Sequence, residues 1–397
     1  MKFNWTTKRL SEIAYINPRE SLGKGVVAKK VPMDKLQPFC RDVPGFVLEE
    51  YKGGTKFRNG DTIMARITPC LENGKIAKVS VLSDGEVGFG STEYIVFRAI
   101  DGVSDADFLY YLICSPLVRN PAIKSMVGSS GRQRVQTDVV ASLNIELPPI
   151  EEQRKIGGLL KALDDKIELN NTINNNLEQQ AQAIFKSWFV DFEPFGGVIP
   201  SDWRQGKLGD SCNCILGGTP SRNKSEYWNG SIPWINSGEV NKFRIIKPSE
   251  TITNLGLEKS ATKLLPAKTT VLAITGATLG QVSLLEIDAC ANQSVVGIIP
   301  NDNLPYEYVY PLIKQNIAEL ISHQTGGAQQ HINKQNVENL DIVIPAYTHL
   351  MKYQNTVCGI YEMIANNCFE NDRLSSVRDI ILPKLMSGKL DVSKIKI

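Results

Sequence analysis

Residues 148–192 carry the stretch that decides the fold, PPIEEQRKIGGLLKALDDKIELNNTINNNLEQQAQAIFKSWFVDF. Asn170 and Asn174 hold the middle of a heptad series whose steps alternate between four and three. Such a seam predicts one long coiled-coil helix, which at 1.5 Å per residue would run for roughly 50 Å. A helix of that length needs a partner of matching length. The other positions of the series are apolar or small: Ile156, Leu160, Leu163, Ile167, Leu177, Ala181, Ile184 and Trp188.

The partner helix lies 197 residues further along the chain. The second series keeps the apolar positions with the single exception of Arg378, and it repeats both asparagines. Two asparagines at equivalent places in two seams are improbable by chance, so the chain contains an internal repeat. Adding 197 to each seam position gives Tyr353, Val357, Ile360, Ile364, Asn367, Asn371, Leu374, Arg378, Ile381 and Leu385.

An antiparallel pairing of the two helices would relate the halves of the chain by a pseudo-two-fold axis, because each helix follows its own globular domain. Asn170 would then face Asn371, and Asn174 would face Asn367. Buried asparagine in a seam costs stability but fixes register and orientation. The alternative is that these asparagines are solvated and the seam is broken at its centre. The paired register is the favoured interpretation.

The repeat continues outside the helices with an offset that drifts. Segments 62–65 (TIMA) and 270–273 (TVLA), which read as strands, match at an offset of 208, whereas segments 143–148 and 340–345 match at 197. Insertions are therefore accepted in the globular parts but not along the helices. We expect an α+β fold with globular domains at 1–147 and 193–344. Each is followed by a long helix, within 148–192 and within 345–397 with its tail.

Composition sets broad limits on the function. The apolar share of 42% and the charged share of 22% are ordinary for a soluble globular protein, and the net charge of +2 provides no strong uniform positive field. The sequence has no apolar run of membrane-spanning length, and its first fifteen residues lack the apolar centre of a signal peptide. Eight scattered cysteines without a CxxC pair, and three histidines, argue against a zinc site and predict reduced cytosolic thiols.

The usual sequence signatures of catalysis are absent. The chain has no Walker A, GxSxG, HExxH or GxGxxG pattern, and no HxE followed by PCxxC. It also lacks the Asn/Asp-Pro-Pro-aromatic tetrapeptide that an amino-methyltransferase would use on an extruded base. Enzymatic chemistry in this chain is therefore not expected.

Several motifs, together with the two-fold repeat, resemble those of the specificity subunit of type I restriction-modification enzymes. They are PPIEEQ (148–153), KSWFVDF (186–192), LPKLMSG (382–388), ARITPCLENGK (65–75) and GGTPS (217–221). Each motif is modestly specific, but their order and duplication make the resemblance extend over essentially the whole chain. The second half departs from it at one helix start, where PAYTHL (345–350) replaces PPIEEQ.

The resemblance implies a bacterial, cytoplasmic defence protein that does no chemistry itself. Each globular part would be a target recognition domain for one half of a bipartite double-stranded DNA sequence, and the helices would set the unread gap. The helices would also dock two modification subunits that carry S-adenosylmethionine and methylate adenine at N6. Two restriction subunits that use ATP and magnesium could join that complex. This chain would bind no cofactor and no metal.

Two Gly/Ser-containing loops fit direct contact with DNA, because glycine lets the backbone approach while flanking side chains reach base edges and phosphates. The alternative is that each loop is only a flexible polar connection. The residues nominated are Ser129, Ser130, Arg132, Gln133 and Arg134 in the first half, and Gln329, Gln330 and His331 in the second.

Two further segments are candidates for DNA contact. Asn73 could instead serve only its turn, and Arg66 could be a strand residue that faces water. Trp228 and Trp234 are expected to pack rather than to stack on bases, because duplex readers have little use for exposed rings. The residues nominated are Arg66, Thr68, Asn73 and Lys75 in the first half, and Thr219, Ser221, Arg222, Asn223, Lys224 and Tyr227 in the second.

Two other classes of function compete with this interpretation. A protein-binding scaffold with two modules on a coiled-coil rod explains the helices, but not the Gly-Arg-Gln-Arg and Gly-Ala-Gln-Gln loops. An enzyme with an unfamiliar site is the least supported. Co-purification distinguishes them, because only a specificity subunit predicts a methyltransferase partner.

Overall fold

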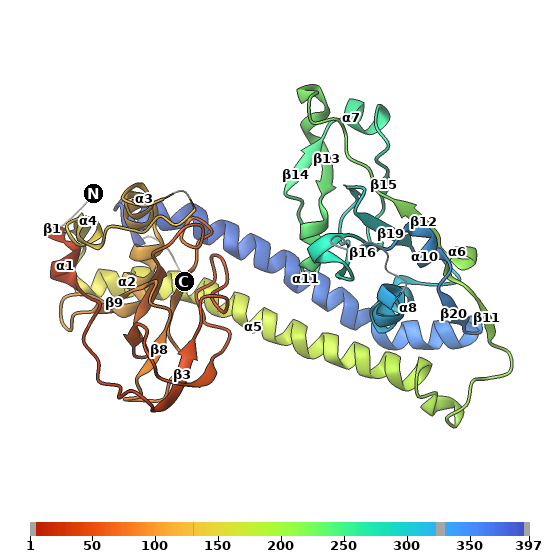
Figure 1. The fold of residues 1–397 in the computed structure, drawn as a ribbon, viewed down its shortest axis with the longest axis horizontal. Helices are drawn as coiled ribbons and strands as arrows, with labels where there is room; N and C mark the ends of the chain where they lie inside the picture. Colours follow the sequence, from red (N-terminus) through yellow and green to blue (C-terminus); the bar gives the residue numbers. More distant parts are fainter. Residues whose placement is uncertain (1–4, 130, 323–329, 393–397) are drawn as a thin grey trace. The chain divides into compact units, whose positions relative to one another are not determined.

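The computed structural model describes residues 5–129, 131–322 and 330–392 (Figure 1). By its internal contacts the chain divides into two compact units. The first is Met1–Glu168 with Asp372–Ile397, and the second is Leu169–Asn371. Each unit therefore combines one globular domain with a part of both long helices.

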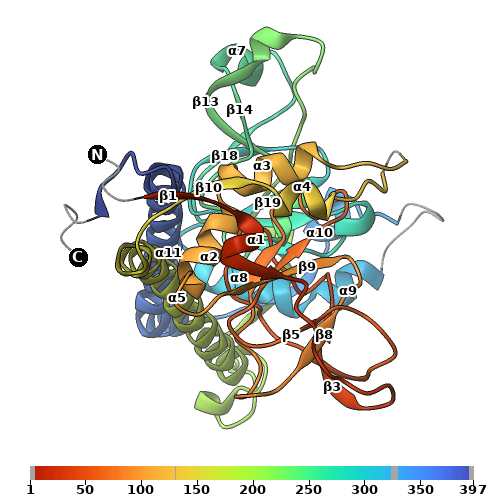
Figure 2. The same cartoon turned by 90° about the vertical axis from the view of Figure 1, so that its left-hand side faces the viewer.

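In the first unit, an antiparallel sheet, a mixed sheet and a short two-stranded ladder carry the described strands of the domain. One sheet has the strand order β2-β9-β6-β7, the other β4-β3-β8-β5, and β1 pairs with β10. Helix α2 (Ala106–Cys114), seen beside β9 and α5 in Figure 2, belongs to the same core as the first turns of α5. The remaining helices are α1 (Leu10–Ile13), α3 (Pro116–Lys124) and α4 (Thr137–Ala141). The strands are β1 (Thr6–Arg9), β2 (Ala14–Ile16), β3 (Val27–Val31), β4 (Val47–Glu50), β5 (Lys56–Phe57), β6 (Thr62–Ala65), β7 (Ile76–Lys78), β8 (Gly88–Gly90), β9 (Tyr94–Ala99) and β10 (Asn144–Leu147).

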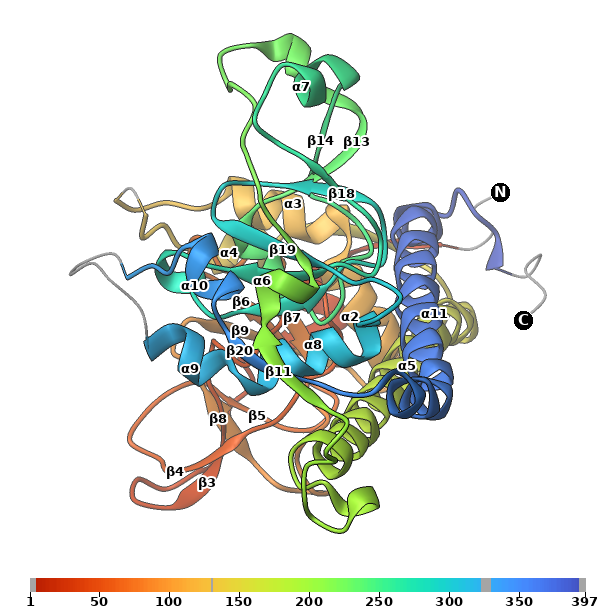
Figure 3. The same ribbon diagram turned by 90° about the vertical axis from the view of Figure 1, so that its right-hand side faces the viewer.

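The second unit repeats this topology strand for strand. Its described strands pair in the orders β12-β19-β16-β17, β14-β13-β18-β15 and β11-β20, so each label is that of the first unit plus ten (Figure 3). The strands are β11 (Arg204–Lys207), β12 (Asn213–Leu216), β13 (Trp228–Ile235), β14 (Glu250–Ile252), β15 (Leu264–Leu265), β16 (Thr270–Ala273), β17 (Val282–Leu284), β18 (Ala289–Ala291), β19 (Val295–Ile299) and β20 (Asp341–Ile344). The helices are α6 (Leu208–Ser211), α7 (Asn254–Glu258), α8 (Tyr306–Gln315), α9 (Ile317–Ser322) and α10 (Lys334–Glu338), with short 3₁₀ turns η1 (Glu193–Phe195), η2 (Ser225–Tyr227), η3 (Ser237–Asn241) and η4 (Gly276–Thr278).

Strands β6 and β16 are the two segments that the sequence predicts as matching strands. Each lies inside its sheet, β6 between β9 and β7 and β16 between β19 and β17. All four residues of each strand are buried. A strand covered on both faces shows a continuous apolar run rather than alternation, which is the pattern of TIMA and TVLA.

The two long helices have identical lengths and equivalent bounds. Helix α5 covers Ile150–Phe189 and helix α11 covers Tyr347–Met386, 40 residues each. Both ends differ by the 197 positions that separate the two seams. The repeat therefore fixes the helix boundaries as well as the seam positions.

The second unit holds the central asparagines, and they meet in pairs. The Asn170 side chain donates to Asn371 Oδ1 over 2.9 Å and to the Glu370 carboxylate over 2.7 Å. Asn367 donates to Asn174 Oδ1 over 2.9 Å. Asn170 and Asn174 are buried, with 0% and 2% of their surface exposed. These are the two pairs expected from the sequence, and their numbering makes the helices antiparallel here.

The divergent helix starts make equivalent contacts with different residue types. In the first unit Trp5 Nε1 donates to Glu152 over 3.1 Å, and in the second Trp203 Nε1 donates to His349 Nδ1 over 2.9 Å. The next residue of α5 is the buried Gln153, which Leu350 replaces in the apolar core of the second unit. The second helix start, PAYTHL, therefore keeps the hydrogen bond from the tryptophan. It replaces the buried glutamine of the first helix start with an apolar leucine.

Candidate nucleic-acid interface

The first domain brings its two nominated segments onto one surface. The loop 66–75 joins β6 to β7, and the loop 127–134 joins α3 to α4. Thr68 N donates to Gln133 O over 3.0 Å, and Val135 N donates to Arg66 O over 2.8 Å. Segments some sixty residues apart in the sequence therefore form one continuous backbone ladder.

The loop 127–134 is a narrow hairpin. Val127 and Arg134 exchange both backbone hydrogen bonds, over 3.0 and 2.9 Å. Gly128 and Gly131 have φ of +137° and +78°, values that other residues rarely adopt. Ser129 and Arg132 are exposed at the tip, and Gln133 is half-buried. Ser130 lies outside the described residues.

The two arginines of this hairpin differ electrostatically. Arg134 donates from two guanidinium nitrogens to Glu93 over 2.7 and 3.0 Å. These hydrogen bonds hold the pKa of Glu93 below its ordinary value of 4.5, and Glu93 raises the pKa of Arg134. In the part of the chain that the structure describes, no ion pair involves the exposed Arg132. Arg132 is therefore the arginine whose charge is available to a ligand.

The loop 66–75 presents some of its polar groups and uses others internally. Asn73 is exposed at the tip. The Thr68 hydroxyl donates to Glu72 over 2.9 Å, and Lys75 Nζ donates to Met33 O over 2.9 Å. Arg66 is half-buried, and its guanidinium reaches Val135 O over 3.4 Å. Asn73 is thus the nominated side chain of this loop that is most accessible.

The second domain has the same construction at equivalent positions. Gly276 N donates to Gln330 O, and Ile332 N donates to Ile274 O, each over 3.0 Å. Thr275 and His331 form an isolated bridge, as Ile67 and Arg134 do in the first domain. Thr275 lies 208 positions after Ile67, and His331 lies 197 positions after Arg134. These are the offsets at which the neighbouring segments of the two halves match. Both Gln330 and His331 are exposed, and Gln329 lies outside the described residues.

One segment of this surface was missed from the sequence. Residues 274–281, ITGATLGQ, join β16 to β17 and take the place of the loop 66–75. Thr275 and Thr278 are partly exposed on it. The signal was present, because the offset that aligns TIMA with TVLA extends into this loop. The two loops themselves share too little sequence to reveal the match.

The GGTPS segment runs beside the loop 274–281. A Cβ on Gly217 would lie 2.1 Å from Asn292 O, so only glycine permits this approach. The Thr219 hydroxyl donates to the Gln293 side chain, and the next carbonyl, Ser294 O, accepts from Ile274 N over 2.9 Å. Thr219 is therefore part of the same surface.

The other nominated residues of this region belong to the segment 221–227, which leads into β13. Its last residue, Tyr227, accepts from Thr253 N over 2.9 Å beside α7, and β13, β14 and α7 form an arm that projects from the rest of the second unit (Figure 3). The Arg222 guanidinium stacks 3.7 Å from the Trp228 ring and pairs with Glu250 over 2.7 Å. Lys224 Nζ donates to the hydroxyl of the buried Tyr227 over 3.0 Å. The exposed Ser221 and Asn223 are the freer nominated side chains here.

The tryptophans of the arm pack as expected from the sequence. Trp234 is buried and donates to Gly218 O over 3.1 Å, and Trp228 stacks edge-on against it with ring centroids 5.1 Å apart. Trp228 also donates to Ser221 O over 3.2 Å. Both indoles thus hold the loop 217–221 in place rather than offering an open ring.

Other kinds of site find no support in the described ranges. No group of three or more His, Cys, Asp or Glu side chains there could hold a metal ion. The eight cysteines are free thiols, and burial raises the pKa of Cys114, Cys212 and Cys214 to about 12. Within the same ranges, no helix has the length and apolar character needed to cross a membrane.

Known proteins resemble this chain over most of its length. A family model described as the type I restriction modification DNA specificity domain matches residues 3–179 and 200–349. The specificity subunit of type I restriction enzyme HindI from Haemophilus influenzae is 27% identical over 88% of this chain and 89% of that protein. The MjaIX specificity subunit from Methanocaldococcus jannaschii is 28% identical over 74% of this chain and 71% of that protein.

A solved structure supports the fold. The crystal structure of the S subunit of a type I restriction-modification system from M. genitalium superposes with a TM-score of 0.59. The superposition covers 96% of both chains at 15% sequence identity. At that identity the likeness concerns the fold alone, and it agrees with the predicted α+β architecture of two repeated domains and two long helices.

Proposed function

The chain belongs to the family of type I restriction-modification DNA specificity subunits, and from this premise we propose that each of its two domains reads one half of a bipartite DNA target. The repeated surface carries this proposal. Each domain joins the loop after its interior strand to a second polar loop by the same backbone ladder, at equivalent positions. A chain that presents two copies of one surface is suited to a target with two half-sites.

The side chains on the two surfaces suit different bases. Arg132 can donate to guanine, Asn73 and Gln133 can pair with adenine, and Ser129 can reach phosphate. In the second domain, Gln330, His331 and Thr219 supply amide, imidazole and hydroxyl groups. The residues 221–224 before the arm would add contacts outside the loop pair. The two half-sites should therefore differ in sequence.

The long helices would act as spacer and as docking surface. Their 40-residue lengths are equal, and helix length is a rigid quantity because each residue adds about 1.5 Å. We infer that two modification subunits, bearing S-adenosylmethionine, dock on them and methylate adenine. Restriction subunits that use ATP would join the same complex in the cytoplasm. This chain would contribute recognition and no catalysis.

Methylation mapping tests the proposal directly. DNA from cells with and without this protein should differ in N6-methyladenine at one bipartite motif. Insertion of one heptad into both helices should lengthen the unread gap and leave both half-sites unchanged. Unchanged methylation on removal of the protein would refute the assignment.

A matched pair of variants tests the first domain. Arg132→Ala should weaken binding to the mapped duplex and leave co-purification of the methyltransferase intact. Lys52→Ala is the control, because it removes one positive charge from a side chain of the same domain that is 79% exposed and whose recorded ion pair is with Glu50 over 3.8 Å. If both variants weaken binding equally in a titration at fixed salt, the loss is general electrostatics and not recognition.

A further inference from the structure

Arg378, the one charged residue in the second seam, is not exposed. Its side chain is 12% exposed, and it pairs over 2.6 Å with Asp164 of α5, whose side chain is 5% exposed. The second Asp164 oxygen accepts from the Tyr111 hydroxyl of α2 over 2.6 Å. Burial acts to lower the pKa of Arg378, but Asp164 and Asp379 outweigh it and raise the pKa. The guanidinium is therefore a fixed cation in the first unit.

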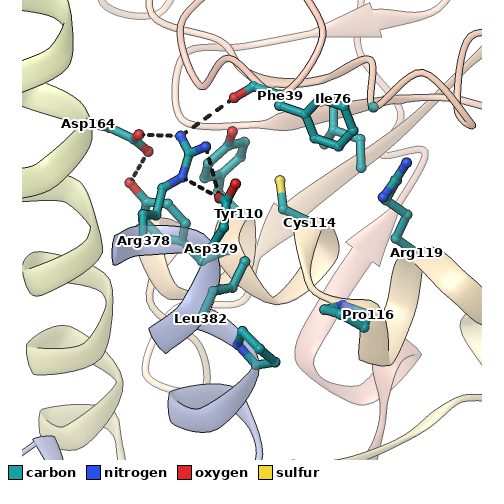
Figure 4. A pocket seen from close by; sticks show the side chains of 13 residues that line it. Phe39, Ile76, Tyr110, Cys114, Pro116, Arg119, Asp164, Arg378, Asp379 and Leu382 are labelled. Atoms are coloured by element: carbon teal, nitrogen blue, oxygen red, sulfur yellow. Dashed lines mark hydrogen bonds and ion pairs between the residues drawn. The ribbon is translucent and has the colours of Figure 1, made fainter. Parts of the chain in front are cut away.

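The same guanidinium reaches toward the loop 66–75 through one residue. Arg378 Nη1 lies 3.5 Å from Phe39 O, and Phe39 N donates to Gly74 O over 3.0 Å (Figure 4). Phe39 has a φ of +57°, an uncommon conformation for a residue with a side chain. A Cβ on Gly74 would lie 2.6 Å from the Phe39 ring, so the ring rests directly on this glycine. Phe39 thus connects helix α11 to the residue that follows Asn73.

A second contact holds the loop 66–75 from the same side. Arg119 of α3 donates to Glu72 O over 2.7 Å, and its guanidinium stacks 5.0 Å from the centre of the Phe39 ring. Arg41, two residues after Phe39, donates to Lys161 O of α5 over 3.2 Å and pairs with Asp165 over 2.7 Å. The segment 39–41 is therefore fixed to α5 and α11 at one end and to the loop at the other.

A pocket of about 240 Å³ that is open to solvent lies among these parts, lined by Phe39, Gly74, Tyr110, Arg119, Arg378 and Leu382 among others (Figure 4). Leu382 and Leu385 of α11 belong to the same apolar core as Ile76, which follows the loop, so packing also holds the helix and the loop together. The contact of Arg378 with Phe39 O adds a polar connection at the edge of the pocket.

The second domain fixes its equivalent loop differently. Gly280, with a φ of +82°, takes the place of Gly74. A Cβ on Gly280 would lie 2.5 Å from the Ile321 side chain of α9, so an aliphatic contact replaces the aromatic one. The seam position equivalent to Arg378 is Ala181, which is buried in the apolar core. The Arg378–Asp164 pair is not repeated at the equivalent seam position, and the second domain instead pairs its buried Arg244 with Glu178 of α5 over 2.8 Å.

We propose that Arg378 and Asp164 are positioning residues, which hold the loop 66–75 through Phe39 so that the first domain discriminates the bases of its half-site. The proposal rests on the proposed function, in which this loop reads DNA. It explains why a seam whose positions are otherwise apolar or asparagine keeps a largely buried arginine at one place. It also links the helices, where the partner subunits are proposed to dock, to one of the two recognition surfaces.

The test uses the full chain in complex with its methyltransferase. Asp164→Asn with Arg378→Leu removes both buried charges together, keeps an acceptor for Tyr111, and supplies the aliphatic residue that a seam prefers. Asp379→Asn is the control, because it removes a 62% exposed carboxylate that contacts the same guanidinium. Arg378→Lys keeps a cationic donor near Asp164 and Phe39 and is the rescue variant.

Two readouts are compared. Amide hydrogen exchange across residues 66–75 of the free complex should accelerate in the double variant. Affinity for duplexes altered in one half-site at a time should lose discrimination at one half-site by about tenfold, the value of one good base contact, and keep it at the other. The control should match the unsubstituted protein in both readouts, and the rescue variant should recover part of the discrimination.

The outcomes separate the two ideas. Unchanged exchange in the loop, or equal loss at both half-sites, would overturn the positioning role. Faster exchange with discrimination intact at both half-sites would leave Arg378 as the residue that holds the loop. In that case it is the assignment of residues 66–75 to DNA reading that fails.

Discussion

Gly157 and Gly158 of α5 stand side by side and have opposite surroundings, so alanine at each position tests how this helix is seated on the first domain. A Cβ on Gly157 would lie 2.7 Å from Phe108 N and 3.1 Å from Asp105 Oδ1. Among the described residues, a Cβ on Gly158 would meet nothing within 4 Å. The two substitutions are chemically identical and differ only in what the new methyl group touches.

The magnitudes follow from that difference. Replacing glycine by alanine inside a helix stabilises it by about 0.8–1.0 kcal/mol, and Gly158→Ala should show this gain. At Gly157 the same gain meets the capped start of α2, where Asp105 accepts from Asp107 N and Phe108 N over 3.0 and 2.9 Å. Overpacking costs about 1–3 kcal/mol and a lost cap about 1 kcal/mol more. The variants should therefore differ by about 2–4 kcal/mol in their free energy of unfolding.

Urea unfolding of the full chain, followed by far-ultraviolet circular dichroism, measures this difference. Gly158→Ala should move the midpoint of the first unit's transition to higher urea, and Gly157→Ala should move it to lower urea. Equal stabilisation by both variants would refute the close seating of α5 on α2. Hydrogen exchange of the α2 amides provides a local check, since only Gly157→Ala should accelerate it.

Three further predictions concern other parts of the chain. A double-mutant cycle of Asn170→Ala and Asn371→Ala should give a coupling energy of about 0.5–1.5 kcal/mol, and additive effects in urea unfolding would deny the pair a role in stability. Burial raises the pKa of Glu307 above its ordinary value of 4.5, which means that the buried carboxylate destabilises the fold at neutral pH, so Glu307→Gln should stabilise the second unit there by about 1 kcal/mol or more. This gain should vanish below pH 4.5, where the carboxyl is protonated in both the folded and the unfolded state. A gain that persists in acid would contradict the explanation. Arg132→Ala should cost about 1–3 kcal/mol of binding to the cognate duplex, and unchanged affinity in a salt-controlled titration would remove the hairpin from the interface.

The sequence predicts those features that depend on periodicity along the chain. The constant offset of 197 anticipates the matching bounds of α5 and α11, and the antiparallel numbering places Asn170 opposite Asn371. Strands β6 and β16 are recognisable because a doubly covered strand is a short, continuous apolar run. In each case the structure repeats a regular local pattern, which a single sequence displays in full.

Features that depend on contacts between distant segments are different. The pairing of Thr68 with Gln133, and of Gly276 with Gln330, joins loops whose sequences carry no record of each other. The loop 274–281 also shares too little sequence with the loop 66–75 to reveal their equivalence, although the offset that matches their strands extends into it. In the sequence, Arg378 is a charged exception among the apolar positions of the seam, and nothing along the chain indicates that Asp164 lies opposite.

The sequence by itself determined that this chain is a duplicated α+β protein with two long helices of equal length and asparagines at their centre. It did so because helices and strands impose periods that the residues must follow. Only the tertiary structure decided which polar loops share a surface in each domain, and that Arg378 of the seam pairs with Asp164 behind the loop 66–75. Those arrangements arise from burial and hydrogen bonding between segments far apart in the chain, for which no single stretch of sequence contains the partner.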